Sequence, residues 1–311
     1  MALLAGIESG GTKTVCAVAT DPSTIMARVR VPTSADPRET LAAVADFIAT
    51  QSAERGPLAA VGIGSFGPCD PDPTSATYGY VTSTPKPGWQ NTNVIGILAA
   101  LLHDRGMGGV PFGFDTDVNA AALGEQRFGA AQGLSSVVYV TVGTGIGGGA
   151  MVDGRLLHGL VHPEMGHIRI PRPASEVESF AGVCPYHGDC WEGVAAGPAI
   201  SARWGAPGET LAPDHPAWEL EAAYIAVGLH ALVCVLSPER VILGGGVGSS
   251  PTLQDRVRPL LVESLAGYLS SPTIVEHIDS YVVPPGLGDN AGVVGALALA
   301  QDAVVAGVQA G

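Results

Sequence analysis

Cysteine and histidine residues gather in one short stretch of the chain, residues 184–190, which reads Cys-Pro-Tyr-His-Gly-Asp-Cys. Thiolate sulfur and imidazole nitrogen are ligands of tetrahedral zinc, and a site closed by four protein ligands is structural. A cysteine pair at this spacing also suits a buried thiol pair or a redox bridge. Residue type therefore leaves zinc and thiol chemistry open. The candidate metal ligands are His167, Cys184, His187 and Cys190, with His162 as an alternative ligand.

Three carboxylates occupy positions that suit work on a hydroxyl group. Asp117 comes where a predicted strand gives way to a helix. It can therefore act as a general base or cap the helix, and residue type alone balances the two roles. Glu164 and Glu192 lie beside the cysteine and histidine segments, where carboxylates can accept hydrogen bonds from hydroxyl groups. Residue type alone favours solvated surface glutamates at both positions.

Two glycine turns join pairs of short apolar strands. The first is Gly10-Gly11-Thr12-Lys13, and the second runs over residues 143–149, with Thr144 in it and Thr141 just before it. Residues 62–67 and 143–148 match the dinucleotide glycine pattern, but neither match leads into the helix that such a site needs. The P-loop pattern is not met either. Backbone amides in such turns can hold phosphate oxygens, and tight hairpins are the structural alternative.

Apolar runs and turn residues predict the elements that position these groups. Asp36-Pro37-Arg38-Glu39 predicts the N-cap, first turn and capping box of a helix. Predicted strands cover residues 3–7, 15–19, 26–31, 59–63, 111–115, 136–142, 150–152, 155–157 and 240–243. Further predicted helices cover residues 120–126, 218–236 and those from 291 onward.

The plan of strand, glycine turn and strand occurs twice in the chain. Such an internal duplication predicts an α/β protein of two related lobes that face each other across a cleft. We expect an N-terminal lobe of residues 1–115 plus 292–311 and a C-terminal lobe of residues 116–291, which carries the cysteine and histidine segments.

Composition excludes several classes of protein. The formal net charge of −14 is unfavourable for nucleic-acid binding, which needs clustered Lys and Arg against phosphates. Apolar runs such as Val94–Leu102 are too short to span a bilayer. Five cysteines, an odd number, argue against a full disulfide framework. The first nine residues lack the basic start of a signal peptide. We therefore expect a cytoplasmic protein without nucleic-acid or membrane partners.

Several motifs, in order along nearly the whole chain, resemble those of the sugar kinases of the family named for repressors, open reading frames and kinases (ROK). The resemblance is greatest to its bacterial zinc-containing fructokinases. The motifs are Gly6–Lys13, Pro85–Trp89, Asp115–Glu125, Thr141–Gly149, His162–His167, Cys184–Glu192 and Leu287–Gly292.

This resemblance implies an actin-like ATPase (ribonuclease H-like) fold, ATP with Mg²⁺, structural Zn²⁺ and a homodimer. The implied reaction moves the γ-phosphoryl group of ATP to fructose, giving fructose 6-phosphate, with Asp117 as the base. The implied ATP-binding residues are Gly10, Gly11, Thr12, Lys13, Thr141, Gly143, Thr144, Gly145, Gly244, Gly245 and Gly246. The implied sugar-binding residues are Gly67, Gln90, Thr116, Glu164 and Glu192. The implied zinc ligands are His167, Cys184, His187 and Cys190, while His158 is expected to be structural.

Alternatives remain within and outside this activity. Many relatives carry Asp at the position of Glu8 and Asn at the positions of Gln90 and Thr116, so the metal and sugar contacts can differ from those of glucose kinases. A kinase for glucose, mannose or an amino sugar would share every motif. A sugar-responsive repressor fits poorly, because the first hairpin already begins at Gly6 and the charge is unfavourable. A noncatalytic sugar-binding protein would need the loss of Asp117 or of a phosphate loop.

Overall fold

The computed structural model describes residues 2–309, which form two compact units. Of these residues, the first unit holds those up to Gly129, the segment Leu156–Pro163 and those from Asp289 onward. The second unit holds Ala130–Arg155 and Glu164–Gly288. Each unit is built around one five-stranded sheet.

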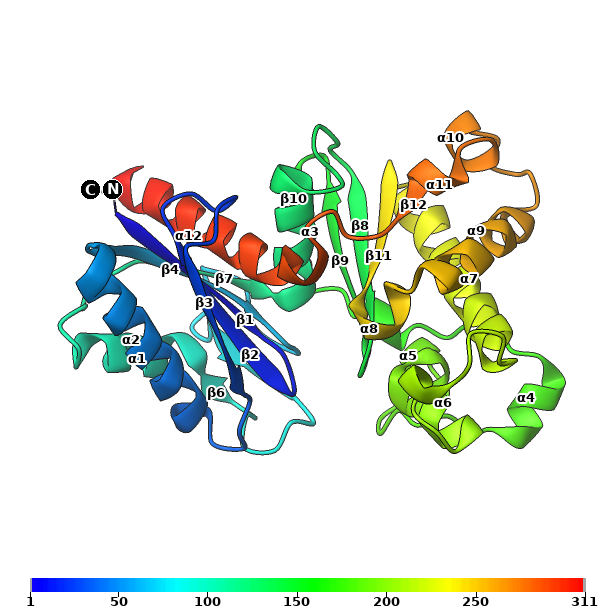
Figure 1. The fold of residues 1–311 in the computed structure, drawn as a ribbon, viewed down its shortest axis with the longest axis horizontal. Helices are drawn as coiled ribbons and strands as arrows, with labels where there is room; N and C mark the ends of the chain where they lie inside the picture. The colour runs from blue at the N-terminus through cyan, green and yellow to red at the C-terminus, as the bar shows by residue number, and fades with distance from the viewer. Residues whose placement is uncertain (1, 310–311) are drawn as a thin grey trace. The chain divides into compact units, whose positions relative to one another are not determined.

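The first unit carries the sheet β3-β2-β1-β4-β7, in which β1 pairs antiparallel with β2 and parallel with β4. Helices α1 and α2 pack on one face of this sheet and α12 on the other (Figure 1). The elements of this unit are β1 (Leu3–Ser9), β2 (Lys13–Ala19), β3 (Ala27–Pro32), α1 (Pro37–Arg55), β4 (Leu58–Ser65), β5 (Tyr80–Val81), β6 (Thr92–Asn93), α2 (Val94–His103), β7 (Phe112–Thr116), α3 (Asp117–Phe128), most of η3 (Gly288–Asn290) and α12 (Ala291–Gln309).

The second unit carries the sheet β10-β9-β8-β11-β12, in which β8 pairs antiparallel with β9 and parallel with β11. Its strand order and these pairings repeat those of the first unit, which agrees with the duplication read from the sequence. Its elements are β8 (Val137–Val142), β9 (Ile146–Val152), β10 (Arg155–Leu156), η1 (Met165–His167), α4 (Ala174–Ser179), α5 (Trp191–Ala195), α6 (Gly197–Trp204), η2 (Gly208–Thr210), α7 (Ala217–Leu236), β11 (Arg240–Gly244), α8 (Gly245–Gly248), α9 (Pro251–Leu265), α10 (Pro272–Val275), α11 (Ile278–Tyr281) and β12 (Val282–Val283).

Helix α3 belongs to the first unit, so the units divide after residue 129 and not at the expected residue 115. Helix α3 belongs to the first unit because it packs closely on α12. A Cβ atom added at Gly124 of α3 would lie 2.6 Å from the carbonyl oxygen of Ala291, and one added at Gly295 of α12 would overlap the carbonyl of Ala120. Glycine on both helices removes the side chains that would hold them apart, a packing signal that strand periodicity does not carry.

Helix α7 is, among the described residues, the one helix long and apolar enough by length and composition to cross a membrane. Ten of its residues are buried, among them Tyr224, Ile225 and Leu229, and it packs against α9, α5 and α6. These contacts are those of a core helix of the second unit.

Candidate functional site

The first unit presents Asp117 at the start of α3, immediately after β7. Thr116 is the N-cap of this helix, and its Oγ1 accepts a hydrogen bond from the backbone N–H of Asn119 at 3.1 Å. The Oδ1 atom of Asp117 accepts one from the backbone N–H of Val118 at 2.9 Å. The helix is therefore capped by Thr116, and Asp117 is the first residue of its first turn.

Two further sugar candidates of the first unit lie in neighbouring loops. The parallel pairing of β4 with β7 sets Ser65 opposite Thr116, so the Gly67 loop begins beside the start of α3. The ring of Phe66 packs edge-on against that of Trp89 with their centroids 5.2 Å apart. Gln90 follows this tryptophan and donates from Nε2 to the carbonyl oxygen of Thr84. The aromatic pair thus holds the Gln90 motif to the Gly67 loop.

The first glycine turn closes with a hydrogen bond from the N–H of Gly10 to the carbonyl oxygen of Lys13 at 2.9 Å. Thr33 braces this turn, because its Oγ1 donates to the carbonyl oxygen of Gly10 and its N–H to that of Thr12. Gly11, Thr12 and Lys13 are exposed. Behind them, burial raises the pKa of the Glu8 carboxyl, which lies against Gly292. The exposed residues of the turn are therefore accessible to an anion, while the hydrogen bonds from Thr33 hold its backbone in place.

The nucleotide candidates of the second unit converge at the ends of β8 and β11. Gly244 pairs with Thr141 in the parallel ladder. Gly245 has a φ of +86°, and a Cβ added there would lie 2.6 Å from the Oγ1 atom of Thr141. At Gly143 an added Cβ would lie 3.7 Å from the backbone nitrogen of Gly246. Two glycine turns distant in sequence therefore form one surface made of backbone.

Glu192 joins this glycine surface to the sugar candidates of the second unit. Its Oε2 accepts a hydrogen bond from the N–H of Ile146 at 3.0 Å, and a Cβ added at Gly145 would lie 2.6 Å from the same oxygen. The pKa of Glu164 is raised to about 7, first by desolvation and second by the charge of Glu192, although 40% of its side chain is exposed. The two glutamates are thus close enough to interact.

The four expected metal ligands come together in the second unit. Their ligand atoms all lie within 4.8 Å of one another. The Nδ1 atom of His167 lies 3.5 Å from the Sγ atom of Cys190 and 3.7 Å from that of Cys184, and Nδ1 of His187 lies 3.7 Å from Sγ of Cys184. Tetrahedral zinc with its usual bond lengths to sulfur and nitrogen separates two such ligands by about 3.6 Å. The donor set and its spacing therefore fit zinc.

His162, the alternative ligand, is not part of this group. Its Nε2 atom accepts a hydrogen bond from the backbone N–H of Cys69 at 3.0 Å, within the first unit. Because burial lowers the pKa of His162, the neutral ring that accepts this bond is favoured. His158 also lies in the first unit, where its Nε2 donates to Asp115.

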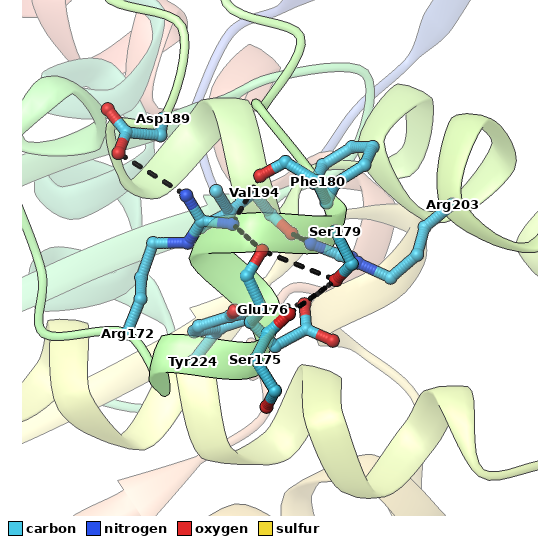
Figure 2. Close-up of polar contacts among 9 residues, drawn as sticks. All are labelled: Arg172, Ser175, Glu176, Ser179, Phe180, Asp189, Val194, Arg203 and Tyr224. Carbon is cyan, nitrogen blue, oxygen red and sulfur yellow. Dashed lines mark hydrogen bonds and ion pairs between the residues drawn. The ribbon is translucent and has the colours of Figure 1, made fainter.

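A buried polar network supports the candidate metal loop, residues 184–190, and sequence patterns alone did not mark it. Arg172, 4% exposed, donates to Oδ2 of Asp189 and to the carbonyl oxygens of Glu176 and Phe180 (Figure 2). Asp189 stands between the ligands His187 and Cys190. Scattered arginines form no motif, so only their burial in the folded chain identifies them.

Arg203 forms the second half of this network. Both terminal nitrogens of its guanidinium donate to the carbonyl oxygen of Val194 at 3.1 Å, and its Cζ lies 4.1 Å from the centre of the Phe180 ring. Nε of Arg203 lies 3.3 Å from a carboxylate oxygen of Glu176, to which Tyr224 donates. Through α4, the metal loop is therefore tied to α5, α6 and α7 (Figure 2).

Comparisons with known proteins agree with these features. The model of the ROK family matches residues 4–303. The fructokinase of Zymomonas mobilis is 42% identical over 297 residues, covering 94% of this chain and 95% of the relative, and that of Pediococcus pentosaceus is 39% identical, covering 97% and 99%. A solved ROK family glucokinase of Streptomyces griseus, in complex with glucose and AMPPNP, is 27% identical with a TM-score of 0.73, covering 96% of this chain and 99% of that one.

Proposed function

The chain belongs to the ROK family, and from this membership we propose that it is an ATP-dependent fructokinase, which converts fructose to fructose 6-phosphate. The expected actin-like ATPase fold is confirmed by solved ROK sugar kinases that match over almost the whole chain. The choice of fructose over other sugars is supported by the relatives named fructokinase.

The observation that carries the kinase proposal is the contact between Glu192 and the glycine hairpin. A carboxylate that can hold sugar hydroxyls touches Gly145 and Ile146, in a turn whose backbone suits phosphate. A phosphoryl transferase needs its acceptor and its phosphate donor side by side. The second unit alone provides surfaces for both.

Asp117 is the proposed base. Phosphoryl transfer needs a carboxylate that takes the proton of the attacking hydroxyl, while cations and amides stabilise the phosphate charge. The sugar oxygen forms a bond to the γ-phosphorus, the bond from that phosphorus to the bridging oxygen breaks, and ADP leaves with the electron pair. MgATP is the proposed donor, and the backbone turns at Gly10–Lys13, at 143–145 and at 244–246 are its proposed contacts.

The proposed sugar contacts are Gly67, Gln90, Thr116, Glu164 and Glu192. Zinc is the proposed occupant of the site formed by His167, Cys184, His187 and Cys190, where a closed set of four ligands gives it a structural role. When bound, it would hold the start of α5, and so Glu192, in one conformation. A homodimer is likewise proposed from the family resemblance, and the cytoplasm is the proposed location.

A sugar panel tests the function. Initial rates at saturating MgATP would be measured with fructose, glucose, mannose and glucosamine through ADP release. Fructose 6-phosphate would be identified separately by coupling to phosphoglucose isomerase and glucose 6-phosphate dehydrogenase. We expect fructose to give the highest kcat/KM. Equal or better turnover of glucose would contradict the choice of fructose as the substrate. Absence of ADP release with every sugar would contradict the proposed kinase activity.

A further inference from the structure

The segment Leu156–Pro163 belongs to the first unit although the chain on both sides of it belongs to the second. Two histidines bond it to the loop after β4 and to the carboxyl end of β7. Nε2 of His162 accepts from the N–H of Cys69, in the loop after β4. Nε2 of His158 donates to Oδ2 of Asp115, in β7, at 2.7 Å. Neither histidine is among the proposed catalytic, sugar or metal residues.

Asp115 is a buried carboxylate whose two oxygens accept hydrogen bonds from different groups. Its Oδ1 accepts from the N–H of Thr116 at 2.8 Å and from Nδ2 of Asn119 at 2.8 Å, both at the start of α3. Its Oδ2 accepts from His158, and 4% of the side chain is exposed. Among the residues that the structure describes, His158 is the hydrogen-bond partner of Oδ2.

Asn119 makes the same connection from the side of the helix. Its Nδ2 atom, which donates to Asp115, lies 3.4 Å from the carbonyl oxygen of Leu157 and 3.4 Å from Nε2 of His158. The segment therefore touches the first turn of α3 through both a side chain and the backbone. Asp117 is the first residue of that turn, two positions beyond Asp115.

We propose that His158 is a positioning residue for the base: its ring holds Oδ2 of Asp115, which leaves Oδ1 to fix the first turn of α3 and the direction of Asp117. This inference rests on the proposed function, since it concerns the base of that reaction. The hydrogen bond to Asp115 also raises the pKa of His158, the direction expected for a ring that donates to a carboxylate.

Loss of the ring would leave a buried carboxylate oxygen without its donor. Such an oxygen costs free energy until the carboxylate turns toward another N–H group or water reaches it. The donors that the carboxylate already has, the N–H of Thr116 and the side-chain amide of Asn119, both lie at the start of α3 and serve Oδ1. A turn of the Asp115 carboxylate would therefore shift the backbone of Thr116 and Asp117, and displacement of a base by about 1 Å costs on the order of a hundredfold in rate.

Two substitutions separate positioning from simple stability. His158→Leu removes the donor and keeps an apolar side chain of moderate size, while His158→Gln keeps an N–H donor on a side chain of similar reach. We expect kcat with fructose to fall about tenfold to a hundredfold in the leucine variant. KM for fructose and for MgATP should stay within about twofold, because the base acts in the transition state. The glutamine variant should recover most of kcat.

The wild-type rate and an exposed histidine provide the references. His277 is exposed in the second unit, and His277→Leu should leave kcat and both KM values unchanged. Leucine at 158 with normal kcat would overturn the inference, as would equal losses in the glutamine and leucine variants. If the melting temperature falls as well, and the loss of kcat equals the loss of folded protein, the role of His158 is structural instead. A wild-type protein without fructose turnover would contradict the proposed function before His158 is in question.

Discussion

Asp117 stands at the first residue of α3 while Thr116, one residue earlier, is the N-cap. From the sequence, helix capping and catalysis were equally good explanations of this aspartate. In the structure the capping oxygen belongs to Thr116, since its Oγ1 accepts from the N–H of Asn119. The capping explanation for Asp117 is weakened, which supports the proposal that its carboxylate serves as the base.

Asp117→Asn tests this proposal at the scale of one atom. Asparagine keeps the shape of the side chain and removes its basicity, so kcat with fructose should fall by about a hundredfold to ten-thousandfold. KM and the melting temperature should change little. Steady-state rates and a thermal melt of the same preparation measure both. Near-normal turnover by a folded variant would show that another group takes the proton.

Histidine shows where residue type stops being informative. His167 and His187 were expected to be ligands because they accompany two cysteines in a known motif, and the structure brings them together. His162 lies only five positions before His167, yet its partner is the backbone of Cys69, about ninety residues away in the chain. Nothing local distinguishes the two histidines, because the difference lies in which unit each one packs against.

Helix η1 carries His167 to the metal group, and its contact with β9 is what fixes it there. A Cβ added at Gly166 would overlap the carbonyl oxygen of Ile146, and one added at Gly148 would lie 2.5 Å from the sulfur of Met165. Ile146 is also the residue whose N–H binds Glu192. Both η1, which carries the candidate metal ligand His167, and the sugar candidate Glu192 therefore contact the backbone of Ile146 in the glycine hairpin.

The substitution Gly166→Ala should consequently weaken zinc binding. The added methyl group has to push η1 away from β9, so His167 moves relative to its fellow ligands. We expect zinc affinity to fall by about tenfold or more, as it does when groups that orient metal ligands are removed. Competition with a chromogenic chelator measures the affinity. Gly159→Ala is the control, because its Cβ would find its nearest neighbour at 3.9 Å. Equal zinc affinity in both variants would show that η1 adjusts freely.

Elements with strong local signals were predicted, and those without were not. The start of α1 is confirmed: Asp36 is its N-cap and accepts from the N–H of Arg38. The capping box is not, since the carboxylate of Glu39 accepts from the hydroxyl of Ser34. Helix α9 was not predicted. It holds Pro259 in its interior, a residue that usually ends a helix.

The two units resemble each other in strand order, but the candidate metal ligands His167, Cys184, His187 and Cys190 all lie in the second unit. Cysteine binds zinc as thiolate, and metal that binds the folded form adds its binding free energy to stability. We expect metal analysis to find about one zinc per chain.

Removal of the metal by a strong chelator should lower the melting temperature and the affinity for fructose, and added zinc should restore both. Cys184→Ser should reduce the zinc content, whereas Cys234→Ser, which changes an exposed cysteine outside the group, should retain it. A metal-free preparation that keeps full activity and stability would reject a structural zinc.

Helix α12 closes one face of the first sheet with Val293, Leu297 and Ala300, which pack against Leu4, Ala17 and Ala60. The last of the strands that need this cover, β4, ends at Ser65, and α12 begins only at Ala291. At about 5–20 residues per second, a ribosome makes the chain between them in roughly tens of seconds. During that time the apolar face of β1, β2 and β4 lacks its native cover. The nascent chain therefore exposes this apolar face until α12 emerges from the ribosome, and chaperones or transient contacts can cover it in the meantime.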